Sequence, residues 1–322
     1  MSGRALKVAI FTISFFLLFS EVSATSFAVY YGNVGPSEFQ KLRAFDVIVL
    51  APTVNATYVS HLSEHHVVVG YLSLATIGGW EPWAKDVPES LIIGHNGEWG
   101  EAIVNFSSSE WKKIVLNKAI PYILSKGYTG VFLDNVDYVD LYPEKKQAMV
   151  NLIRAIRERY PKIVIIVNRG FSVANEIAPY VNYVLFEDFV TYYNFSTKRY
   201  EIYNKGDLKW EFEQIKRLHA LKVPVLALSY VDLSNDSQVR KFSRIVCSYA
   251  KEYNVSGVYM ADVSLQRIGI NPCEKSIEPS EEATVKTAKT VQETEREEKR
   301  ICGPAFIVLM ALTFILPLRR FL

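Results

Sequence analysis

Two acidic residues, Asp134 and Glu187, each come directly after a short apolar run of the sequence. A carboxylate that adjoins a buried strand loses hydration, which costs free energy unless the group is hydrogen-bonded or serves a function. Two carboxylates that face one cleft can cleave a glycosidic bond. One donates a proton to the leaving oxygen, while the other attacks the anomeric carbon or activates a water molecule. Asp134 and Glu187 are therefore the candidate catalytic residues.

Each carboxylate also has a structural interpretation. Asp134 could cap the helix that follows it, and Glu187 could form an ion pair with Arg169. Taken singly, either residue is explained as well by structure as by function. If both lie at one end of one fold, catalysis is favoured, because burial and mutual repulsion push the two pKa values apart and divide the roles of acid and base.

The two carboxylates belong to a pattern in which eight short apolar runs alternate with amphipathic helical segments. Several runs are continuously apolar, which is typical of parallel strands covered on both faces. Eight such units within roughly 250 residues predict an α/β fold, the (β/α)8 TIM barrel. An open, doubly wound sheet is the alternative, but no Gly-x-Gly-x-x-Gly motif follows the first run, which disfavours nucleotide binding. The predicted strands are residues 27–31, 47–51, 67–74, 130–133, 163–167, 183–186, 223–228 and 255–260. Helices are predicted between them, for example over 111–125, 144–160, 208–221 and 237–253, the last capped by Asp236-Ser237.

In a barrel of this type, the side chains that do chemistry follow the carboxyl ends of the strands. Tyrosines there could present ring faces and hydroxyls to a sugar, and Asn168 could hydrogen-bond a sugar hydroxyl or amine. The long segments 75–108 and 190–207 carry several Trp and Tyr residues and are predicted to form aromatic walls of a cleft. The candidate substrate-binding residues are Tyr31, Tyr71, Ser73, Asn135, Asp137, Asn168, Tyr230 and Asp262.

Five motifs lie at these strand ends: Tyr30-Tyr31-Gly32, Tyr71-Leu72-Ser73, the segment 127–137, Asn168-Arg169-Gly170-Phe171, and Glu187. In these motifs the chain resembles the endo-α-1,4-polygalactosaminidase family of glycoside hydrolases, family 114. The resemblance covers about residues 27–270. It implies a barrel, an exported enzyme, and hydrolysis of α-1,4-linked galactosamine-containing polysaccharide. It matches the catalytic Asp of the family to Asp134 and its catalytic Glu to Glu187. By analogy with other retaining barrels, Asp134 is the expected nucleophile and Glu187 the general acid/base, with no metal and no organic cofactor.

One position departs from the family pattern. Where the resemblance leads us to expect Gly-Glu after the motif Tyr71-Leu72-Ser73, this chain has Leu74-Ala75-Thr76. An acidic contact to a cationic amino sugar could therefore be missing. Four other acidic residues near strand ends could replace it, or could be helix caps: Asp137, Asp188, Asp232 and Asp262.

Composition excludes several other classes. The formal net charge is +2 and no basic run interrupts the middle of the chain, which argues against a nucleic-acid partner. The chain has no Cys-x-x-Cys motif and no cluster that combines His with Cys, so a zinc site is not expected. Two competing functions keep the barrel: a catalytically inactive carbohydrate-binding surface protein, and a structural component of the cell envelope without a ligand.

Both ends of the chain have the pattern of targeting segments. Residues 1–25 combine Arg4 and Lys7 with an apolar run and small residues, which predicts a secretory signal peptide, with an uncleaved anchor as the alternative. Residues 274–301 are charged and Thr-rich and predict a flexible stalk, or a lone exposed helix in its second half. Residues 302–322 begin with Cys302-Gly303-Pro304 and continue as a short apolar tail. This tail resembles the Cys-Gly-Pro tails of some archaeal surface proteins, which implies its removal and lipid attachment at Cys302. A plain membrane anchor is the alternative.

The folded domain is therefore predicted to span residues 26–273 of an extracellular, cell-surface-attached protein. Its expected partners are a polysaccharide substrate and the membrane, contacted through the tail or a lipidated Cys302. Five Asn-x-Ser/Thr sequons fit export. An exported protein can form a disulfide between Cys247 and Cys273, although two buried thiols are equally compatible with the sequence.

Overall fold

The computed structural model describes residues 25–97 and 100–274. Eight parallel strands form one sheet, and their order follows the sequence. The predicted (β/α)8 barrel is confirmed, and each predicted strand agrees with an observed one to within two residues. The strands are β1 (Phe27–Tyr30), β2 (Val47–Leu50), β3 (Val67–Ser73), β7 (Gly130–Asp134), β8 (Val164–Asn168), β9 (Tyr183–Glu187), β12 (Val225–Tyr230) and β13 (Gly257–Ala261).

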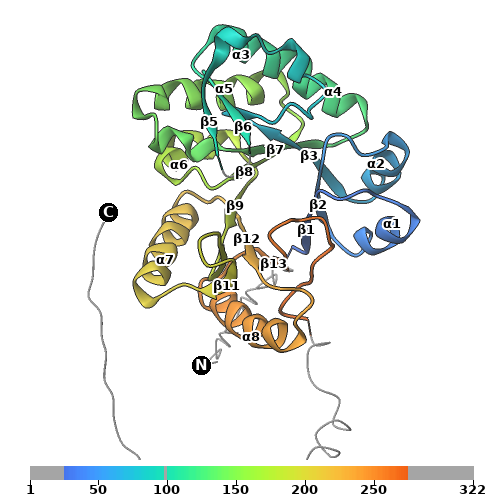
Figure 1. The fold of residues 1–322 in the computed structure, drawn as a ribbon, viewed down its shortest axis with the longest axis vertical. Coiled ribbons are helices and arrows are strands. Elements are labelled where there is room, and N and C mark those ends of the chain that lie inside the picture. Colours follow the sequence, from blue (N-terminus) through green and yellow to red (C-terminus); the bar gives the residue numbers. More distant parts are fainter. Residues whose placement is uncertain (1–24, 98–99, 275–322) are drawn as a thin grey trace, which may run out of the picture. The chain divides into compact units, whose positions relative to one another are not determined.

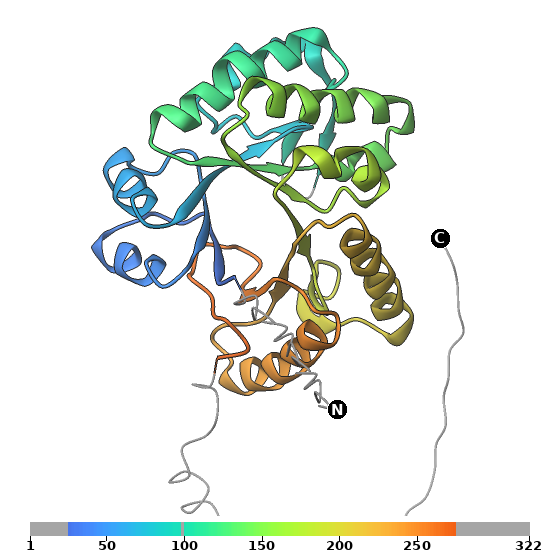
Figure 2. The same ribbon diagram turned by 180° about the vertical axis from the view of Figure 1, so that it is seen from behind.

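The sheet curves until its first and last strands meet, so the barrel is nearly closed (Figure 1). At the meeting point the backbone N–H of Thr25 donates to the carbonyl of Ser256 at 2.7 Å. A Cβ at position 257 would lie 2.2 Å from the carbonyl oxygen of Thr25, so only Gly257 allows the chains to approach this closely. Seen from behind, the helices lie outside the ring of strands (Figure 2).

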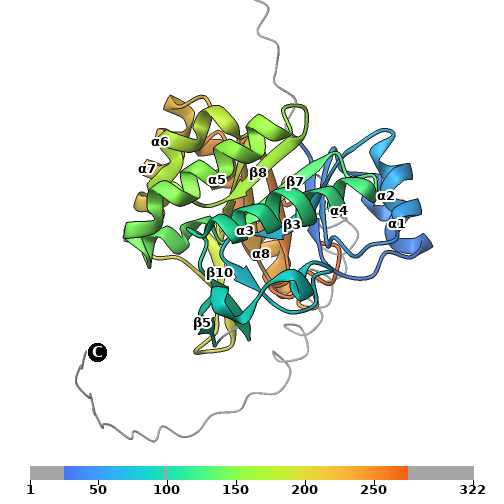
Figure 3. The ribbon, with the colours of Figure 1, turned by 90° about the horizontal axis from the view of Figure 1, so that it is seen from above.

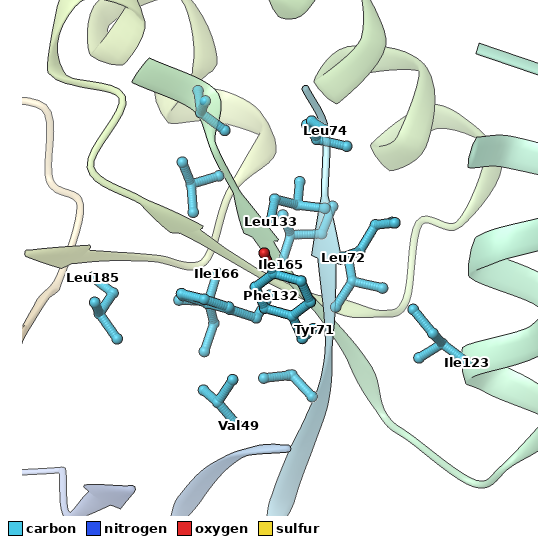
Figure 4. Close-up of a cluster of buried hydrophobic side chains, with 14 of the residues drawn as sticks. Val49, Tyr71, Leu72, Leu74, Ile123, Phe132, Leu133, Ile165, Ile166 and Leu185 are labelled. Carbon is cyan, nitrogen blue, oxygen red and sulfur yellow. The ribbon is translucent and has the colours of Figure 1, made fainter. Parts of the chain in front are cut away.

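The strands are buried on both faces, which explains their continuous apolar runs. All residues of β1, β2, β12 and β13 are buried. Figure 4 shows part of this core, where the rings of Tyr71 and Phe132 from neighbouring strands lie among aliphatic side chains; their centroids are 6.3 Å apart. Side chains that alternate between the barrel interior and the helices fill both layers, so the barrel is a packed core with its polar residues at the strand ends.

Eight α-helices cover the described barrel: α1 (Pro36–Leu42), α2 (Ala56–Ser63), α3 (Ser109–Ile114), α4 (Ile120–Ser125), α5 (Lys146–Arg159), α6 (Ala174–Ile177), α7 (Lys205–Ala220) and α8 (Asp236–Glu252). A π-helical segment, Val115–Ala119, joins α3 to α4. The predicted cap of the last helix is wrong by one residue. Asn235, and not Asp236-Ser237, is the N-cap of α8, because its side-chain oxygen reaches the backbone N–H of Gln238 at 3.1 Å.

Two inserted segments interrupt the alternation of strands and helices, and each follows a barrel strand. After β3, the strands β4 (Thr76–Ile77), β5 (Ile92–Asn96) and β6 (Glu101–Val104) form a separate antiparallel sheet. After β9, β10 (Thr191–Asn194) and β11 (Arg199–Ile202) form a hairpin. Both project from the same end of the barrel (Figure 3). They correspond to the predicted cleft walls, although Trp83 is only 2% exposed and belongs to the core.

The structure joins Cys247 to Cys273 by a disulfide, with the two Cα atoms 5.2 Å apart. Of the two alternatives for these cysteines, the bond is therefore the one observed. Among residues 25–97 and 100–274, no helix is long and apolar enough to cross a membrane. The predicted signal peptide, almost all of the stalk and the tail with Cys302 lie outside the described residues.

Candidate active site

Asp134 is the last residue of β7 and receives three hydrogen bonds. Its Oδ2 accepts one from the hydroxyl of Tyr71 at 2.9 Å. Its Oδ1 accepts from the backbone N–H of Asn135 at 2.8 Å and from Nδ2 of Asn168 at 2.9 Å. Asn135 adopts the left-handed conformation (φ 57°), which turns the chain so that its N–H points back at the carboxylate. Three hydrogen bonds thus hold the Asp134 carboxylate in place, and it does not act as a helix cap.

Glu187 is the last residue of β9 and lies in a different environment. The hydroxyl of Tyr230 donates to its Oε1, and Asn168 Nδ2 donates to its Oε2. Burial, followed by the negative charges of Asp188 and Asp134, raises the pKa of Glu187 to about 7. A carboxyl with such a pKa is partly protonated at neutral pH and can donate a proton.

Asn168 joins the two carboxylates. Its Nδ2 lies 2.9 Å from Asp134 Oδ1 and 2.5 Å from Glu187 Oε2. Those two oxygens can therefore be no more than about 5.4 Å apart, close to the separation of about 5–5.5 Å found in retaining glycosidases. Asn168 is 6% exposed, and its Oδ1 accepts no hydrogen bond from the described residues. One amide group thus holds both carboxylates in one place.

Tyr31 and Tyr71 form the aromatic side of this cluster. Their rings meet edge to face with centroids 5.3 Å apart. Burial raises the pKa of the Tyr31 hydroxyl well above its usual value, and the charges of Asp134 and then Glu187 raise it further. Tyr31 is therefore close to both carboxylates and stays protonated, so its hydroxyl is a potential hydrogen-bond donor to a ligand.

The remaining candidates lie farther from the pair or make other contacts. Ser73 is buried and hydrogen-bonds Thr76 and the side chain of Asn135. Ser73 and Asn135 therefore stabilise the strand end through contacts with each other and with Thr76. Asp262 accepts hydrogen bonds from the backbone and side chain of Ser264, which is a turn contact. Asp137 forms an ion pair with Arg169 at 3.5 Å.

Arg169 does not pair with Glu187, so the structural interpretation of Glu187 is wrong. The guanidinium instead lies 3.9 Å from Asp188 as well as near Asp137. Asp188 follows the end of β9 and has a positive φ of 62°, so the chain turns there and brings this carboxylate beside Arg169. A cavity of about 130 Å³ adjoins this ion pair, lined by Arg169, Phe186, Glu187, Asp188, Tyr203, Asp207, Trp210 and Glu211. In residues 25–97 and 100–274, no group of His, Cys, Asp or Glu side chains has the arrangement of a metal site.

The family model of the glycoside-hydrolase family GH114 matches residues 21–277. This chain belongs to family GH114. The GH114 assignment confirms the predicted glycoside hydrolase, and structural comparison supports the fold. The glycoside hydrolase domain of PelA from Pseudomonas aeruginosa superposes with a TM-score of 0.67 at 21% identity, covering 76% of this chain and 98% of that one.

A second solved structure is similar to the GH114 domain described here. Ega3 from Aspergillus fumigatus, solved in complex with galactosamine, superposes with a TM-score of 0.60 at 16% identity, covering 76% of this chain and 94% of that one. At these identities the likeness shows the fold alone. The search of curated proteins found no match.

Two carboxylates of the GH114 domain escaped the sequence analysis. Glu101, on β6, accepts a hydrogen bond from the Thr76 hydroxyl at 2.7 Å. Glu211, on α7, is 2% exposed and accepts the backbone N–H of Val190 at 3.1 Å. Glu101 lies in the insertion 75–108, whose small sheet has no simple periodicity in the sequence, whereas Glu211 lies within a predicted helix. Only the unusual apolar surroundings of Glu211 within α7 were visible in the sequence.

Glu211 supports the segment that follows Glu187. Asp188 and Val190 both have positive φ, 62° and 64°. This conformation is unfavourable for a β-branched residue and costs on the order of 1–3 kcal/mol. The hydrogen bonds from Val190 N–H to the Glu211 carboxyl compensate for part of this strain. Burial raises the pKa of Glu211 to about 8.

The raised pKa values predict that the domain loses stability as the pH rises. Glu187, Asp188 and Glu211 have folded-state pKa values of about 7, 6 and 8, all above their ordinary values. The folded chain therefore binds more protons than the unfolded chain between about pH 4 and pH 8, and the free energy of unfolding falls across this window. A difference of one unit between the folded and unfolded pKa values corresponds to about 1.4 kcal/mol, or about 3–6 °C in Tm for a domain of this size.

Glu211→Gln should flatten this decline, because glutamine keeps the acceptor oxygen but cannot ionise. We expect its Tm to equal or exceed that of the wild type at pH 8.5 and to depend less on pH between 5 and 8, as measured by calorimetry. Glu213→Gln, an exposed change on the same helix, is the control. An unaltered slope in Glu211→Gln would contradict the assignment.

Proposed function

We propose that this GH114 protein is an extracellular enzyme that cleaves α-1,4-linked galactosamine-containing polysaccharide within the chain, with Asp134 and Glu187 as its catalytic carboxylates. The observation that carries the proposal is the shared hydrogen-bond donor, Asn168 Nδ2, which brings the two carboxylates together. Family membership supports the reaction class. The galactosamine bound to the structurally similar Ega3 supports an amino sugar as the substrate unit.

The two environments support different roles. Asp134 accepts three hydrogen bonds that fix the position of its carboxylate, which suits a nucleophile. Glu187 has a pKa of about 7 and suits the general acid. In the first step Asp134 attacks the anomeric carbon and forms a glycosyl ester, the glycosidic C–O bond breaks, and the proton of Glu187 goes to the leaving oxygen. In the second step the Glu187 carboxylate takes a proton from water, which attacks the anomeric carbon and releases Asp134.

The neighbouring residues position the sugar. The buried Asn168 Oδ1, which has no partner among the described residues, can accept a hydrogen bond from a sugar hydroxyl or amine at the reacting unit. The protonated Tyr31 hydroxyl can donate one. The spacing of the two carboxylates favours retention of the anomeric configuration over inversion, which needs about 6.5–9.5 Å to accommodate a water molecule.

Tyr230 should influence the pKa of the proposed general acid, Glu187. Its hydroxyl stabilises the ionised form of Glu187 and so lowers that pKa. In Tyr230→Phe the pKa of Glu187 rises, and the alkaline limb of kcat/KM moves to higher pH by roughly one unit or less, because a hydrogen bond is worth about 1 kcal/mol. Tyr71→Phe, which removes a hydrogen bond from Asp134 instead, should leave that limb in place. An equal shift in both variants would argue against this division of roles.

The proposed location rests on the sequence together with the disulfide. A disulfide persists in oxidising compartments outside the cytosol, and Cys247–Cys273 fits an exported domain. Attachment through the C-terminal tail, either as an anchor or through lipid on Cys302, is the proposed link to the cell surface. Mass spectrometry of the native protein distinguishes the two, because an intact Leu322 terminus is incompatible with removal of the tail.

Digestion of a glycan panel tests the proposed function. We expect new reducing ends from partially deacetylated galactosaminogalactan and none from chitosan or cellulose. Proton NMR of the first products should detect the α-anomer before mutarotation. Binding of the polymer without release of reducing ends would support the inactive carbohydrate-binding protein instead. Absence of both binding and cleavage across the panel would exclude the proposal.

A further inference from the structure

The acidic residues that the sequence suggested for an amino-sugar contact are all engaged elsewhere. Asp137 and Asp188 share the guanidinium of Arg169. Asp232 and Asp262 each accept hydrogen bonds from the serine two residues further on, as turn contacts. Two of the four carboxylates are thus paired with a cation, and the other two accept hydrogen bonds within their own turns.

Glu101 pairs with no cation among the described residues, and hydrogen bonds link it to the end of the strand that carries Asp134. It lies on β6 in the sheet inserted after β3, where its Oε2 accepts the Thr76 hydroxyl at 2.7 Å. Its Oε1 accepts no hydrogen bond within the described residues, and no described Lys, Arg or His forms an ion pair with it. A partly buried carboxylate without a cation is costly, so a positively charged ligand would be favourable here.

A short chain of hydrogen bonds ties Glu101 to the catalytic strand end. Thr76 donates to Glu101 and accepts from the side chain of Asn135 at 2.8 Å. The backbone N–H of Asn135 in turn donates to Asp134. Burial raises the pKa of Glu101, and the negative charge of Asp134 raises it further. Glu101 is thus held rigidly within electrostatic range of Asp134.

Trp80 provides a ring surface beside the same carboxylate. The indole is 47% exposed, and its ring centroid lies 6.0 Å from that of Tyr71, the residue that hydrogen-bonds Asp134. A Cβ built on Gly78 would lie 2.5 Å from Trp80 Nε1 and 3.6 Å from Glu101 Oε1. Both groups therefore border the same glycine, and the absence of a side chain at Gly78 is what allows the indole to pack this close to the backbone.

We propose that Glu101 and Trp80 form a sugar-binding position next to Asp134 that selects a unit with a free amino group. The pyranose ring packs on the exposed indole, and the ammonium group donates a hydrogen bond to Glu101 Oε1. Glu101 thereby takes the place of the acidic residue that is absent after Ser73. An N-acetylated unit lacks the charge and adds bulk, so it binds here less well. This inference rests on the proposed function and specifies which residue of the site reads the amino group.

Matched oligosaccharides test the inference. The substrates are α-1,4-linked galactosamine oligomers of one length, in free-amine and N-acetylated forms, and kcat/KM is measured for each. Glu101→Gln keeps the acceptor for Thr76 but removes the charge. We expect a loss of about 10–100-fold on the free-amine oligomer, the worth of a hydrogen bond to a charged group, and a change under about threefold on the N-acetylated one. Glu89→Gln, an exposed change in the same insertion, should leave both values unchanged.

Trp80→Ala gives an independent result, since it leaves the hydrogen bonds of Glu101 intact. It should lower kcat/KM for both oligomers to a similar degree, because stacking of the sugar ring does not depend on the amine. Equal effects of Glu101→Gln on the two oligomers, no effect on either, or no effect of Trp80→Ala would overturn the binding position while leaving the catalytic proposal intact. If the wild type cleaves neither oligomer nor the parent polymer, the proposed function fails and this inference fails with it.

Discussion

Replacing Asp134 with Asn should reduce kcat on the polysaccharide by about 10⁴-fold or more, the scale found when an enzyme loses its nucleophile. The amide has nearly the same shape as the carboxylate but cannot attack the anomeric carbon. Binding should survive, because the sugar contacts of Tyr31, Asn168 and the aromatic walls remain. The measurement is reducing-end release, together with calorimetric titration of the same substrate.

Asp140→Asn is the matched control for this experiment. Asp140 is an exposed carboxylate in the short 3-10 helix Val136–Asp140 that follows Asp134, and the substitution removes the same charge a few residues away. We expect its kcat to stay within about threefold of the wild type. If Asp134→Asn folds, binds and still turns over at a comparable rate, the nucleophile is another residue and the proposed mechanism is wrong.

Glu187→Gln should lower kcat/KM by about 10²–10⁴-fold, the usual contribution of a general acid. In the proposed mechanism Glu187 must be protonated in the free enzyme to serve as the acid. Its pKa is about 7, so wild-type kcat/KM should fall as the pH rises through 7. In the variant this alkaline limb should disappear, because glutamine does not titrate. A pH profile of kcat/KM for both proteins tests this directly.

Substrates with different leaving groups can show whether Glu187 acts as the general acid or only has a structural role. An aryl glycoside with an acidic phenol needs little protonation on departure, so its first step should be much less affected by Glu187→Gln than polymer cleavage is. Added azide should then accelerate turnover, since it attacks the glycosyl ester without base assistance. Equal losses on aryl and polymeric substrates, with no effect of azide, would indicate that the substitution had only disturbed the site.

The barrel could be predicted from the sequence because its determinants are local. Parallel strands buried on both faces must be continuously apolar, and this pattern is visible within five or six residues of sequence. The positions of Asp134 and Glu187 followed from the same rule, because carboxyl ends of successive parallel strands meet at one end of a barrel. A boundary such as the N-cap of α8 was less certain, because Asn235, Asp236 and Ser237 can all cap a helix and only the backbone geometry selects one.

The inserted segments could not be predicted in the same way. Residues 75–108 do not have the simple alternation of a buried strand, and their small antiparallel sheet depends on pairing of β6 both with its neighbour β5 and with the more distant β4. Which of the acidic residues beside the strands would be neutralised was also not decided locally. Arg169 could have paired with Glu187, but the turn of the chain at Asp188, which has positive φ, places Asp188 next to its guanidinium.

The strand and helix pattern, the family motifs and the placement of two carboxylates at strand ends could be predicted from the sequence, because each depends on residues close together in the chain. Three features became visible only in the folded structure: Asn168 bridges Asp134 and Glu187, Cys247 and Cys273 are joined, and Glu101 is linked through Thr76 to the strand end of Asp134. These contacts join residues from different strands and insertions. Their distances depend on how the barrel closes and how side chains compete for partners, which no local pattern encodes.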